Sequence, residues 1–426
     1  MKPTRRGPAP SGGAAVQALL TQAVALHKAG NLAQAQAMYR RALELSPEHP
    51  DALHLLGVAE SQSGQHARAI ELIDRALRIR AGDPTFHANR ANALKALGRL
   101  DEALAAYDRA IALKHDFAAA HASRASTLKQ LGRLDDALAA QEEVVRLAPR
   151  NAEAWSSRGA TLKELGRLDD ALASFERAIA LQPRLASAYG NRGVVLHELR
   201  RSTDALASYD RSIELRAGAA ETWTNRGLTL LQLERPDDAL ASFSEAIRLK
   251  PDHANAHANK GLVLQQVDRF EDAVASYGQA VALRPDEGFL YGTWLHARMK
   301  LCDWEGLDAN IAALLAKIGQ GLPVTPPFAV LGLTDSAAVQ RQAAEIAVAA
   351  KHPPRQDLPD ITRRATAGKR RIGYFSADLH EHATAYLMAE LFEQHDRERF
   401  ELVAFSFGPD RGDAMRRRLA AAFDHF

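Results

Sequence analysis

Apolar residues recur along this chain with the spacing of an amphipathic helix, and the whole pattern repeats every 34 residues. In the unit that begins at residue 152, Trp155, Gly159 and Leu162 share one helix face by their i, i+4, i+7 spacing. The units begin at residues 16, 50, 84, 118, 152, 186, 220 and 254. A period of this length accommodates two antiparallel helices with their turns. The pattern therefore predicts eight stacked helical pairs over residues 16–287.

Small and large residues occupy fixed positions of this unit. Position 8 is glycine or alanine throughout, so the two helices can approach closely. Position 20 is alanine in every unit: Ala35, Ala69, Ala103, Ala137, Ala171, Ala205, Ala239 and Ala273. Position 24 is an aromatic ring in six units: Tyr39, Tyr107, Phe175, Tyr209, Phe243 and Tyr277. We expect the rings to fill the space between neighbouring units, and stability to come from stacking.

Each unit also carries signals that end its helices. A proline at position 32 of five units ends the second helix, because proline lacks the amide donor and clashes with the preceding turn. The turn between the two helices has glycine at position 15 in the first five units. In the last three units this position is Arg200, Glu234 or Asp268. We expect those three turns to be slightly strained or differently shaped, because glycine favours the left-handed backbone of such a turn.

This unit of small residues, rings and prolines resembles the tetratricopeptide repeat, which implies a right-handed superhelix with a concave groove that holds other proteins. Positions 2, 6, 9 and 13 of each first helix share one face. From the third unit onward position 6 is occupied by Asn89, Ser123, Ser157, Asn191, Asn225 and Asn259. Primary amides can both donate to and accept from a peptide backbone, so the row predicts binding of an extended chain. The alternative is that asparagine is merely tolerated on a solvated face.

A second row is basic, at position 7, where tetratricopeptide repeats usually have leucine. It consists of Arg90, Arg124, Arg158, Arg192, Arg226 and Lys260. One interpretation is a ladder for acidic partners. The other, which we favour, is that the long stems lie against apolar neighbours while the charged heads reach acidic residues near the start of the second helices. Those acidic residues are Asp101, Asp135, Asp169 and Asp237.

Three units have a histidine at position 4, where others have an aromatic or apolar residue. These are His87, His121 and His257. They lie at least one unit apart, so we interpret them as aromatic substitutes rather than metal ligands.

The period ends at Gly288. Residues 289–304 are predicted to form a helix that caps the stack, residues 305–318 and 336–351 two further helices, and residues 352–369, with four prolines, a connector. Residues 370–378 are predicted as a buried-type strand, 384–395 as a helix, 399–408 as a strand and 413–423 as a basic helix. Such alternation is typical of a parallel α/β sheet. The predicted fold class is thus mostly α, with a short, incomplete α/β segment over 370–426.

The strings IGYFSADLHEHATAYLM, FELVAFSFGPDRGDAMR and FDHF are similar to the first strands and helices of the catalytic region of protein O-GlcNAc transferases, in particular bacterial-type homologues. The upstream LCDW and the loop containing PF resemble that family's link between repeats and catalytic region. The resemblance implies a metal-independent, inverting glycosyltransferase of the GT-B type with Rossmann-like lobes. It implies transfer of N-acetylglucosamine from UDP-GlcNAc to Ser or Thr hydroxyls of proteins, without a further cofactor.

The resemblance also implies site residues. His382 matches the family histidine in the loop after the first strand, near the reacting hydroxyl, as a base candidate or a donor-orienting group. A loop histidine without a catalytic role is the alternative. His380 and His382 also form an HxH pair, but no further ligand with suitable spacing accompanies them, so no metal site is predicted. The family's asparagine row is matched by Asn89, Asn191, Asn225 and Asn259, whereas Ser123 and Ser157 depart from it.

Composition narrows the partners and the compartment. The formal net charge of +2 favours neither nucleic acid nor a membrane surface, and no apolar run reaches the length of a membrane span. A single cysteine, Cys302, excludes an internal disulfide framework. Residues 1–15 are predicted to be a disordered leader rather than a signal peptide. We expect a cytoplasmic protein whose partners are protein or peptide acceptors, with pairing of two copies through the repeats left open.

The family's second lobe, which carries the nucleotide site, has no counterpart before Phe426. Residues 370–426 are too few to enclose the ~300 Å³ or more that a nucleotide sugar requires. We therefore expect an N-terminal part of an O-GlcNAc transferase-like enzyme, inactive by itself, whose repeats over 16–287 recruit the acceptor and whose residues 288–369 are capping helices and a linker. The alternative is a non-catalytic tetratricopeptide scaffold that mediates protein–protein interactions.

Overall fold

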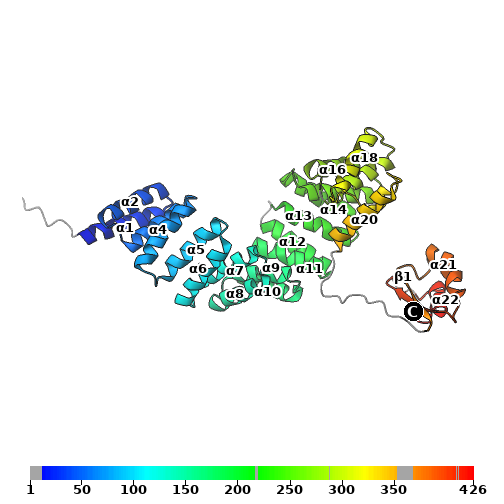
Figure 1. The fold of residues 1–426 in the computed structure, drawn as a ribbon, viewed down its shortest axis with the longest axis horizontal. Helices are drawn as coiled ribbons and strands as arrows, with labels where there is room; N and C mark the ends of the chain where they lie inside the picture. The colour runs from blue at the N-terminus through cyan, green and yellow to red at the C-terminus, as the bar shows by residue number, and fades with distance from the viewer. Residues whose placement is uncertain (1–11, 216–218, 287, 353–367, 409, 411) are drawn as a thin grey trace, which may run out of the picture. The chain divides into compact units, whose positions relative to one another are not determined.

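The structure, a computed structural model, describes residues 12–215, 219–286, 288–352, 368–408, 410 and 412–426 (Figure 1). The chain divides into two compact units, residues 1–352 and 353–426. Most of the predicted leader and most of the predicted connector lie outside the described residues. The first helix, α1, runs over Gly12–Lys28 and so begins earlier than predicted. Val16, the first residue of the repeat frame, is buried.

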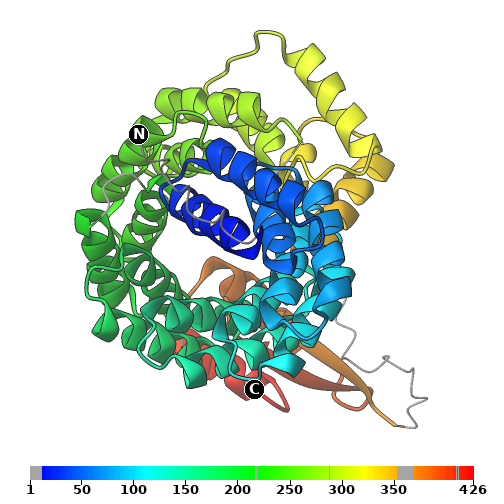
Figure 2. The same ribbon diagram turned by 90° about the vertical axis from the view of Figure 1, so that its left-hand side faces the viewer.

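The first unit confirms the predicted helical pairs. The first helices of the repeats are α1, α3 (Pro50–Gln62), α5 (Pro84–Ala96), α7 (Ala118–Gln130), α9 (Ala152–Glu164), α11 (Ala186–Glu198), α13 (Ala220–Gln232) and α15 (Ala254–Gln266). The second helices are α2 (Leu32–Leu45), α4 (His66–Ile79), α6 (Leu100–Leu113), α8 (Leu134–Leu147), α10 (Leu168–Leu181), α12 (Ser202–Leu215), α14 (Pro236–Leu249) and α16 (Phe270–Leu283). Successive repeats turn about a common axis, as the end-on view in Figure 2 shows.

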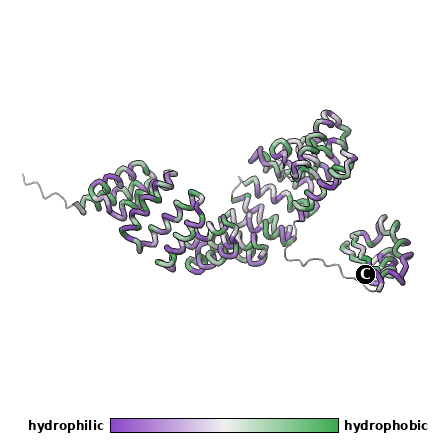
Figure 3. The backbone as a smooth tube through the Cα atoms, viewed as in Figure 1, coloured by the Kyte–Doolittle hydropathy of each residue, from purple (hydrophilic) through white to green (hydrophobic). Residues whose placement is uncertain are grey.

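Small and large residues interlock within each repeat. The rings at position 24 are buried and lie against position 8 of the first helix. A Cβ added to Gly193 would lie 2.6 Å from the ring of Tyr209, and one added to Gly227 would lie 2.6 Å from that of Phe243. No real Cβ sits so close to a carbon, so glycine is required there. Figure 3 shows the resulting alternation of hydrophobic and hydrophilic segments along every helical pair.

The turns between first and second helices all have the same left-handed backbone. The five glycines at position 15 have φ between 73° and 81°, and Arg200, Glu234 and Asp268 have φ of 60°, 56° and 59°. The prediction that the last three turns have a different shape is therefore wrong. The left-handed backbone of Arg200, Glu234 and Asp268 agrees with the alternative prediction of strain. A side chain with a Cβ pays a steric penalty in this region that glycine does not.

Four further helices follow the repeats within the first unit: α17 (Leu290–Lys300), α18 (Leu307–Gly319), α19 (Pro327–Val330) and α20 (Ala337–Lys351). The buried Leu295 of α17 packs with Val281 of α16, so α17 covers the end of the stack. Helix α17 is shorter than predicted because Cys302, at φ 54°, turns the chain. The Arg298 guanidinium then binds the carboxylate of Asp303, at 2.7 and 2.9 Å, which secures this turn. The short helix α19 was not predicted.

The described part of the second unit is a two-stranded parallel sheet with two helices. Strand β1 (Arg370–Ser376) pairs with β2 (Phe400–Ser406), and α21 (Ala383–Glu393) connects them, followed by α22 (Ala414–Ala422). Both helices cover one face of the sheet, around the buried Leu402. On the other face Phe375 and Phe405 stack at 4.3 Å and are exposed. The prediction of strand 370–378 as a buried type is therefore wrong for the described residues, since β1 has one covered face.

Within the described residues, no helix combines the length and the apolar character needed to cross a membrane.

Candidate functional site

The asparagines of repeats 6 to 8 offer unengaged amides. Asn191 of α11 and Asn225 of α13 line one hollow of about 230 Å³ between these helices. Asn259 occupies the same repeat position on α15, and all three are half-buried. Among the residues that the structure describes, none makes a hydrogen bond with the side chains of these three asparagines. We call Asn191, Asn225 and Asn259 the open amide row.

Asn89 lies at the same repeat position but is engaged. Its amide nitrogen donates to Nε2 of His54, 2.8 Å away, and its amide oxygen lies 3.5 Å from the amide nitrogen of Asn92. His54 stacks on the ring of Phe86 at 4.3 Å. Burial lowers the pKa of His54 to about 4, so the imidazole is neutral at pH 7 and can accept this bond. The structure therefore sets Asn89 apart from the open amide row.

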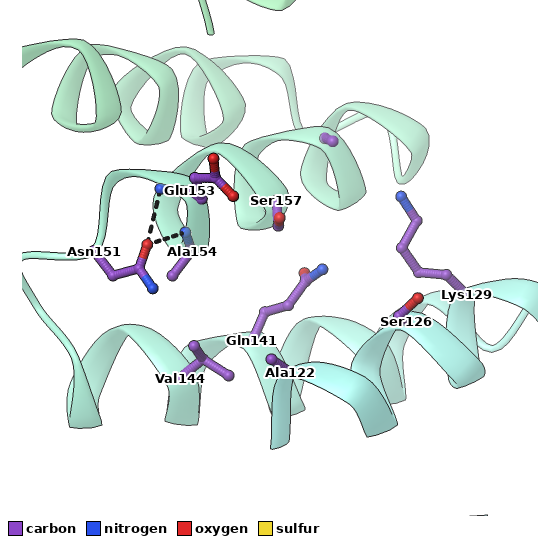
Figure 4. Close-up of a pocket in the computed structure, with 10 residues that line it drawn as sticks. Ala122, Ser126, Lys129, Gln141, Val144, Asn151, Glu153, Ala154 and Ser157 are labelled. Carbon is purple, nitrogen blue, oxygen red and sulfur yellow. Dashed lines mark hydrogen bonds between the residues drawn. The ribbon is translucent and has the colours of Figure 1, made fainter. Parts of the chain in front are cut away.

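Repeats 4 and 5 have serine in place of asparagine. Ser157 lines a pocket of about 400 Å³ between α7, α8 and α9, together with Gln141 of α8 (Figure 4). Gln141 was not among the residues predicted for the site. The signal was present, because residue 141 is the amide in repeat 4 at the position where six other repeats have a ring. The hydrogen bond between His54 and Asn89 had no comparable signal in the sequence, because it joins two repeats and depends on where their side chains lie.

The arginines of the basic row are bound within the stack. Their partners are mostly acidic residues of the preceding repeat's second helix rather than those near the start of the second helices, so the predicted partners are wrong. The pairs are Arg90 with Asp74 at 2.6 Å, Arg124 with Asp108 at 2.6 Å, Arg158 with Glu142 at 3.3 Å, and Arg226 with Asp210 at 2.7 Å. Guanidinium groups also lie over rings at position 4, as Arg226 over Trp223 at 5.6 Å. The row thus ties neighbouring repeats together.

The histidines at position 4 make the same hydrogen bond as the tryptophan indole of Trp155 at that position. Nε2 of His87, His121 and His257 lies 2.9, 3.1 and 3.0 Å from the carbonyl oxygen six residues earlier. The indole N–H of Trp155 donates to the carbonyl of Pro149 at 3.1 Å in the same manner. A ring N–H at this position therefore closes the loop between repeats. The described residues contain no group of three or more His, Cys, Asp or Glu side chains suited to a metal ion.

In the second unit, His382 lies in the loop after β1 as the N-cap of α21. The backbone N–H of Thr384 donates to its Nδ1 at 3.2 Å, so in the neutral ring Nε2 carries the proton. The carboxylate of Asp378 is 3.8 Å from the same Nδ1. The imidazole is about half exposed, 46%. His382 therefore presents an N–H donor to the solvent at the carboxyl end of the strand.

His380 is placed differently. His380 is buried, with 8% of its surface exposed. Its Nδ1 has no hydrogen-bond partner within the described part of the chain. The rings of His380 and His382 lie 6.0 Å apart. The two histidines thus face different surroundings although one residue separates them.

The loops that follow β1 and β2 meet at one edge of the sheet. A Cβ on Gly408 would lie 1.8 Å from the carbonyl oxygen of Ala377, so only glycine allows this approach. Arg416 of α22 donates to the hydroxyl of Ser406 at 2.9 Å and reaches the carbonyl of Leu379 at 3.4 Å. Ligands of open α/β sheets bind outside the carboxyl ends of the strands. His382 lies at this edge.

Comparison with protein-family models divides the chain in the same way. Tetratricopeptide repeat models match residues 20–84 and 156–220, 118–151 and 254–287, and 220–253, and a TPR repeat model matches residues 91–132. The model of Glycosyl transferase family 41 matches residues 343–426.

Solved structures resemble parts of the chain. YrrB, described as a TPR protein with an unusual peptide-binding site, is 26% identical, with a TM-score of 0.39 over 43% of this chain and 95% of its own. The APC/C hetero-tetramer Cut9–Hcn1 is 18% identical, with a TM-score of 0.47 over 66% of this chain and 55% of that one. A tetratricopeptide repeat protein from Parabacteroides merdae is 18% identical, with a TM-score of 0.45 over 59% of this chain and 99% of that one.

The sequence resemblance to tetratricopeptide repeats and to O-GlcNAc transferases is confirmed by these family models. The chain consists of stacked tetratricopeptide repeats, a class of module typical of protein–protein interaction, with a domain of Glycosyl transferase family 41, the O-GlcNAc transferase family, at its C-terminal end.

Proposed function

We propose that this chain belongs to a protein glycosyltransferase that moves N-acetylglucosamine from UDP-GlcNAc to Ser or Thr, and that its repeats hold the acceptor as an extended segment. The observation that carries the binding part is the open amide row, with Asn191 and Asn225 lining one hollow. The family 41 match over residues 343–426 supports the transfer part.

The chemistry of the open amide row suits a peptide backbone. Each primary amide has two N–H donors and an oxygen acceptor, and a backbone residue offers one N–H and one C=O. Three unengaged amides in consecutive repeats can therefore hold an extended chain with little regard to its side chains. Because the arginines of repeats 3 to 7 are bound within the stack, selection of acidic peptides by the basic row is not part of this proposal.

For His382 the geometry favours the donor-orienting role over that of a base. With Nδ1 accepting from Thr384, Nε2 carries a proton and can donate to a sugar or phosphate oxygen. Action as a base at Nε2 would require the other tautomer, which gives up the cap of α21. We expect His382→Asn, whose side chain also caps helices, to leave the folded structure intact.

Binding is tested with the full chain and a fluorescein-labelled Gly/Ser peptide of about a dozen residues, since an extended residue spans about 3.3 Å. The triple change Asn191→Ala, Asn225→Ala and Asn259→Ala should lower affinity roughly 150-fold, at about 1 kcal/mol for each lost amide pair. Asn31→Ala removes an exposed amide that caps nothing and serves as the control. Unchanged affinity in a folded triple variant would remove the proposed role of the row.

The transfer is tested on the protein captured from its native cell with an antibody against the repeats. Incubation with UDP-[¹⁴C]GlcNAc should label Ser or Thr residues of added acceptor proteins, and β-elimination should release the label. A captured protein that binds peptides through the open amide row but transfers no sugar would favour the non-catalytic scaffold instead.

A further inference from the structure

The side chain at position 24 reaches from the second helix to the groove face of the first helices. In repeat 3 the ring of Tyr107 is fully buried, and its hydroxyl donates to Asn92 of α5 at 2.6 Å. In repeat 4 the residue at this position is Gln141, which is shorter than tyrosine. Gln141 lines a pocket of about 400 Å³ between α7, α8 and α9, whereas the equivalent hollow at repeat 6, which has Tyr209 at position 24, measures about 230 Å³. Repeat 4 thus presents an amide to its pocket, at the position where repeats 3 and 5 have an aromatic ring.

Gln141 is itself buried and lacks a partner for its oxygen. The residue is 6% exposed, and among the described residues no donor reaches Oε1. Figure 4 shows its amide pointing into the pocket, between Ser157 on one side and Ser126 with Lys129 on the other. A buried acceptor without a donor is unfavourable. A ligand that enters the pocket with an N–H group would supply that donor.

The rest of the lining has no unpaired cation among the described residues. The ammonium of Lys129 is paired with Glu164 at 2.9 Å, and the hydroxyl of Ser126 accepts from Lys95 at 2.8 Å. Ser157 is exposed at the pocket and can donate or accept. Asn151, Val144 and alanines also line the pocket. Glu153 is a further lining residue, but its side chain is exposed, so solvent and salt screen the attraction of its carboxylate for a cation. Without an unpaired cation the pocket does not select a carboxylate, and with an amide and hydroxyls it does not select a hydrocarbon.

We propose that this pocket takes the carboxamide side chain of an asparagine or glutamine in the bound peptide. The carboxamide N–H donates to Oε1 of Gln141, and its oxygen accepts from the amide of Gln141 or the hydroxyl of Ser157. The pocket lies at repeats 4 and 5, where serine replaces the asparagine that would contact the peptide backbone. It thereby adds selection of one side chain to a groove that otherwise reads backbone, and in this respect it rests on the proposed function.

The probe for the pocket is N-acetyl-glutamine N-methylamide, compared with N-acetyl-norleucine N-methylamide, whose side chain has similar length and no polar group. Binding to the full chain is followed by saturation-transfer NMR. The glutamine probe should bind at least about fivefold more tightly than the norleucine probe, as expected for one or two hydrogen bonds to a buried amide. Equal binding of the two probes would overturn the proposal.

Two variants locate the effect. Gln141→Tyr restores the ring, and repeat 3 shows that tyrosine fits opposite alanine, since Tyr107 faces Ala91 as residue 141 faces Ala125. It should abolish binding of both probes. Gln141→Leu keeps the volume without the amide and should reverse the preference. Gln182→Tyr, the same substitution at an exposed residue, should change nothing. Glutamine-probe binding that persists in Gln141→Tyr would place the site elsewhere and overturn the proposal.

The probes are too short to span repeats, so they do not depend on the open amide row. Failure of the peptide test with intact probe selectivity would refute the backbone-binding function, and the pocket would then act on a side chain presented in another way. Loss of probe selectivity with an intact peptide test would refute the pocket alone.

Discussion

Repeats 3 to 5 and repeats 6 to 8 use the same helical pair yet present different groove faces. In repeats 6 to 8 the amides of Asn191, Asn225 and Asn259 are unengaged among the described residues. In repeats 3 to 5 the corresponding amide is tied to His54 or replaced by serine. Groove-facing positions are not needed for stacking, because neighbouring repeats pack through other positions. Each half of the groove can therefore acquire its own chemistry on an unchanged frame.

The packing positions divide the repeats at another point, between repeats 3 and 4 and repeats 5 to 8, and the two positions change together. Repeats 5 to 8 have glycine at position 8 against a ring at position 24, whereas repeat 3 combines Ala91 with Tyr107 and repeat 4 combines Ala125 with Gln141. The residues at positions 8 and 24 must therefore match within each repeat, and the pair in repeat 4 places an amide in the wall of a pocket. Substitutions in either group of repeats can test this difference.

The largest expected effect concerns the tie that removes Asn89 from the amide row. The pKa of His54 is lowered from 6.5 to about 4 by burial, with Arg80 lowering it further and Asp83 and Asp51 opposing. The unfolded chain therefore binds the proton first, and the contribution of neutral His54 is complete above pH 6.5 and lost as the pH falls toward 4. The loss amounts to about 3 kcal/mol. Thermal melts followed by circular dichroism between pH 7.5 and 4 should show it.

The matched variant is His54→Gln, which keeps an acceptor for Asn89 and does not titrate. Its melting temperature should start lower at pH 7.5, because the stacking on Phe86 is lost, but should fall less on acidification. An equal fall in both proteins would mean that other groups cause the acid sensitivity. Protonation of His54 should also release Asn89, which would make repeat 3 resemble repeats 6 to 8.

A smaller effect is expected from exchanging the packing choices. Gly227→Ala places a methyl 2.6 Å from the ring of Phe243 and should lower the free energy of unfolding by about 2 kcal/mol. The reverse exchange, Ala91→Gly, should cost about 1 kcal/mol through helix propensity. Urea unfolding of Gly227→Ala, Phe243→Leu and the double variant tests the contact. If the two single losses simply add, the methyl and the ring do not meet.

The sequence predicted the frame of the molecule because stacking imposes a pattern on every repeat. Alanine at position 20, rings at position 24 and the 34-residue period were sufficient to place the helical pairs, and strand–helix alternation placed β1, α21 and β2 within a few residues. Helix α19 was missed because a four-residue helix has no periodicity. The seven residues of β1 do not indicate by themselves that helices cover only one face of the strand.

The candidate site was less predictable. The positions of the asparagines follow from the repeat, but their availability depends on neighbours: Asn89 is bound to a histidine 35 residues away. The acidic partners of the basic row were mispredicted although they follow the repeat, since each one lies 16 residues before its arginine. The family resemblance predicted His382, but its tautomer is known only from the hydrogen bond that the backbone N–H of Thr384 donates to Nδ1. The tie of Asn89 and the tautomer of His382 depend on side-chain geometry and leave no periodic trace in the sequence.

The smallest expected effect distinguishes the first five turns from the last three. Glu234→Gly replaces a left-handed residue at φ 56° with one that adopts this backbone freely, and should raise the free energy of unfolding by roughly 0.5–1 kcal/mol. The gain is below the full steric penalty, because glycine also has more freedom in the unfolded chain. Gly166→Glu makes the opposite exchange in repeat 5 and should lower stability by a similar amount, measured by urea unfolding. A loss in Glu234→Gly would mean that the glutamate side chain stabilises its turn, and the three non-glycine turns would then be adapted rather than strained.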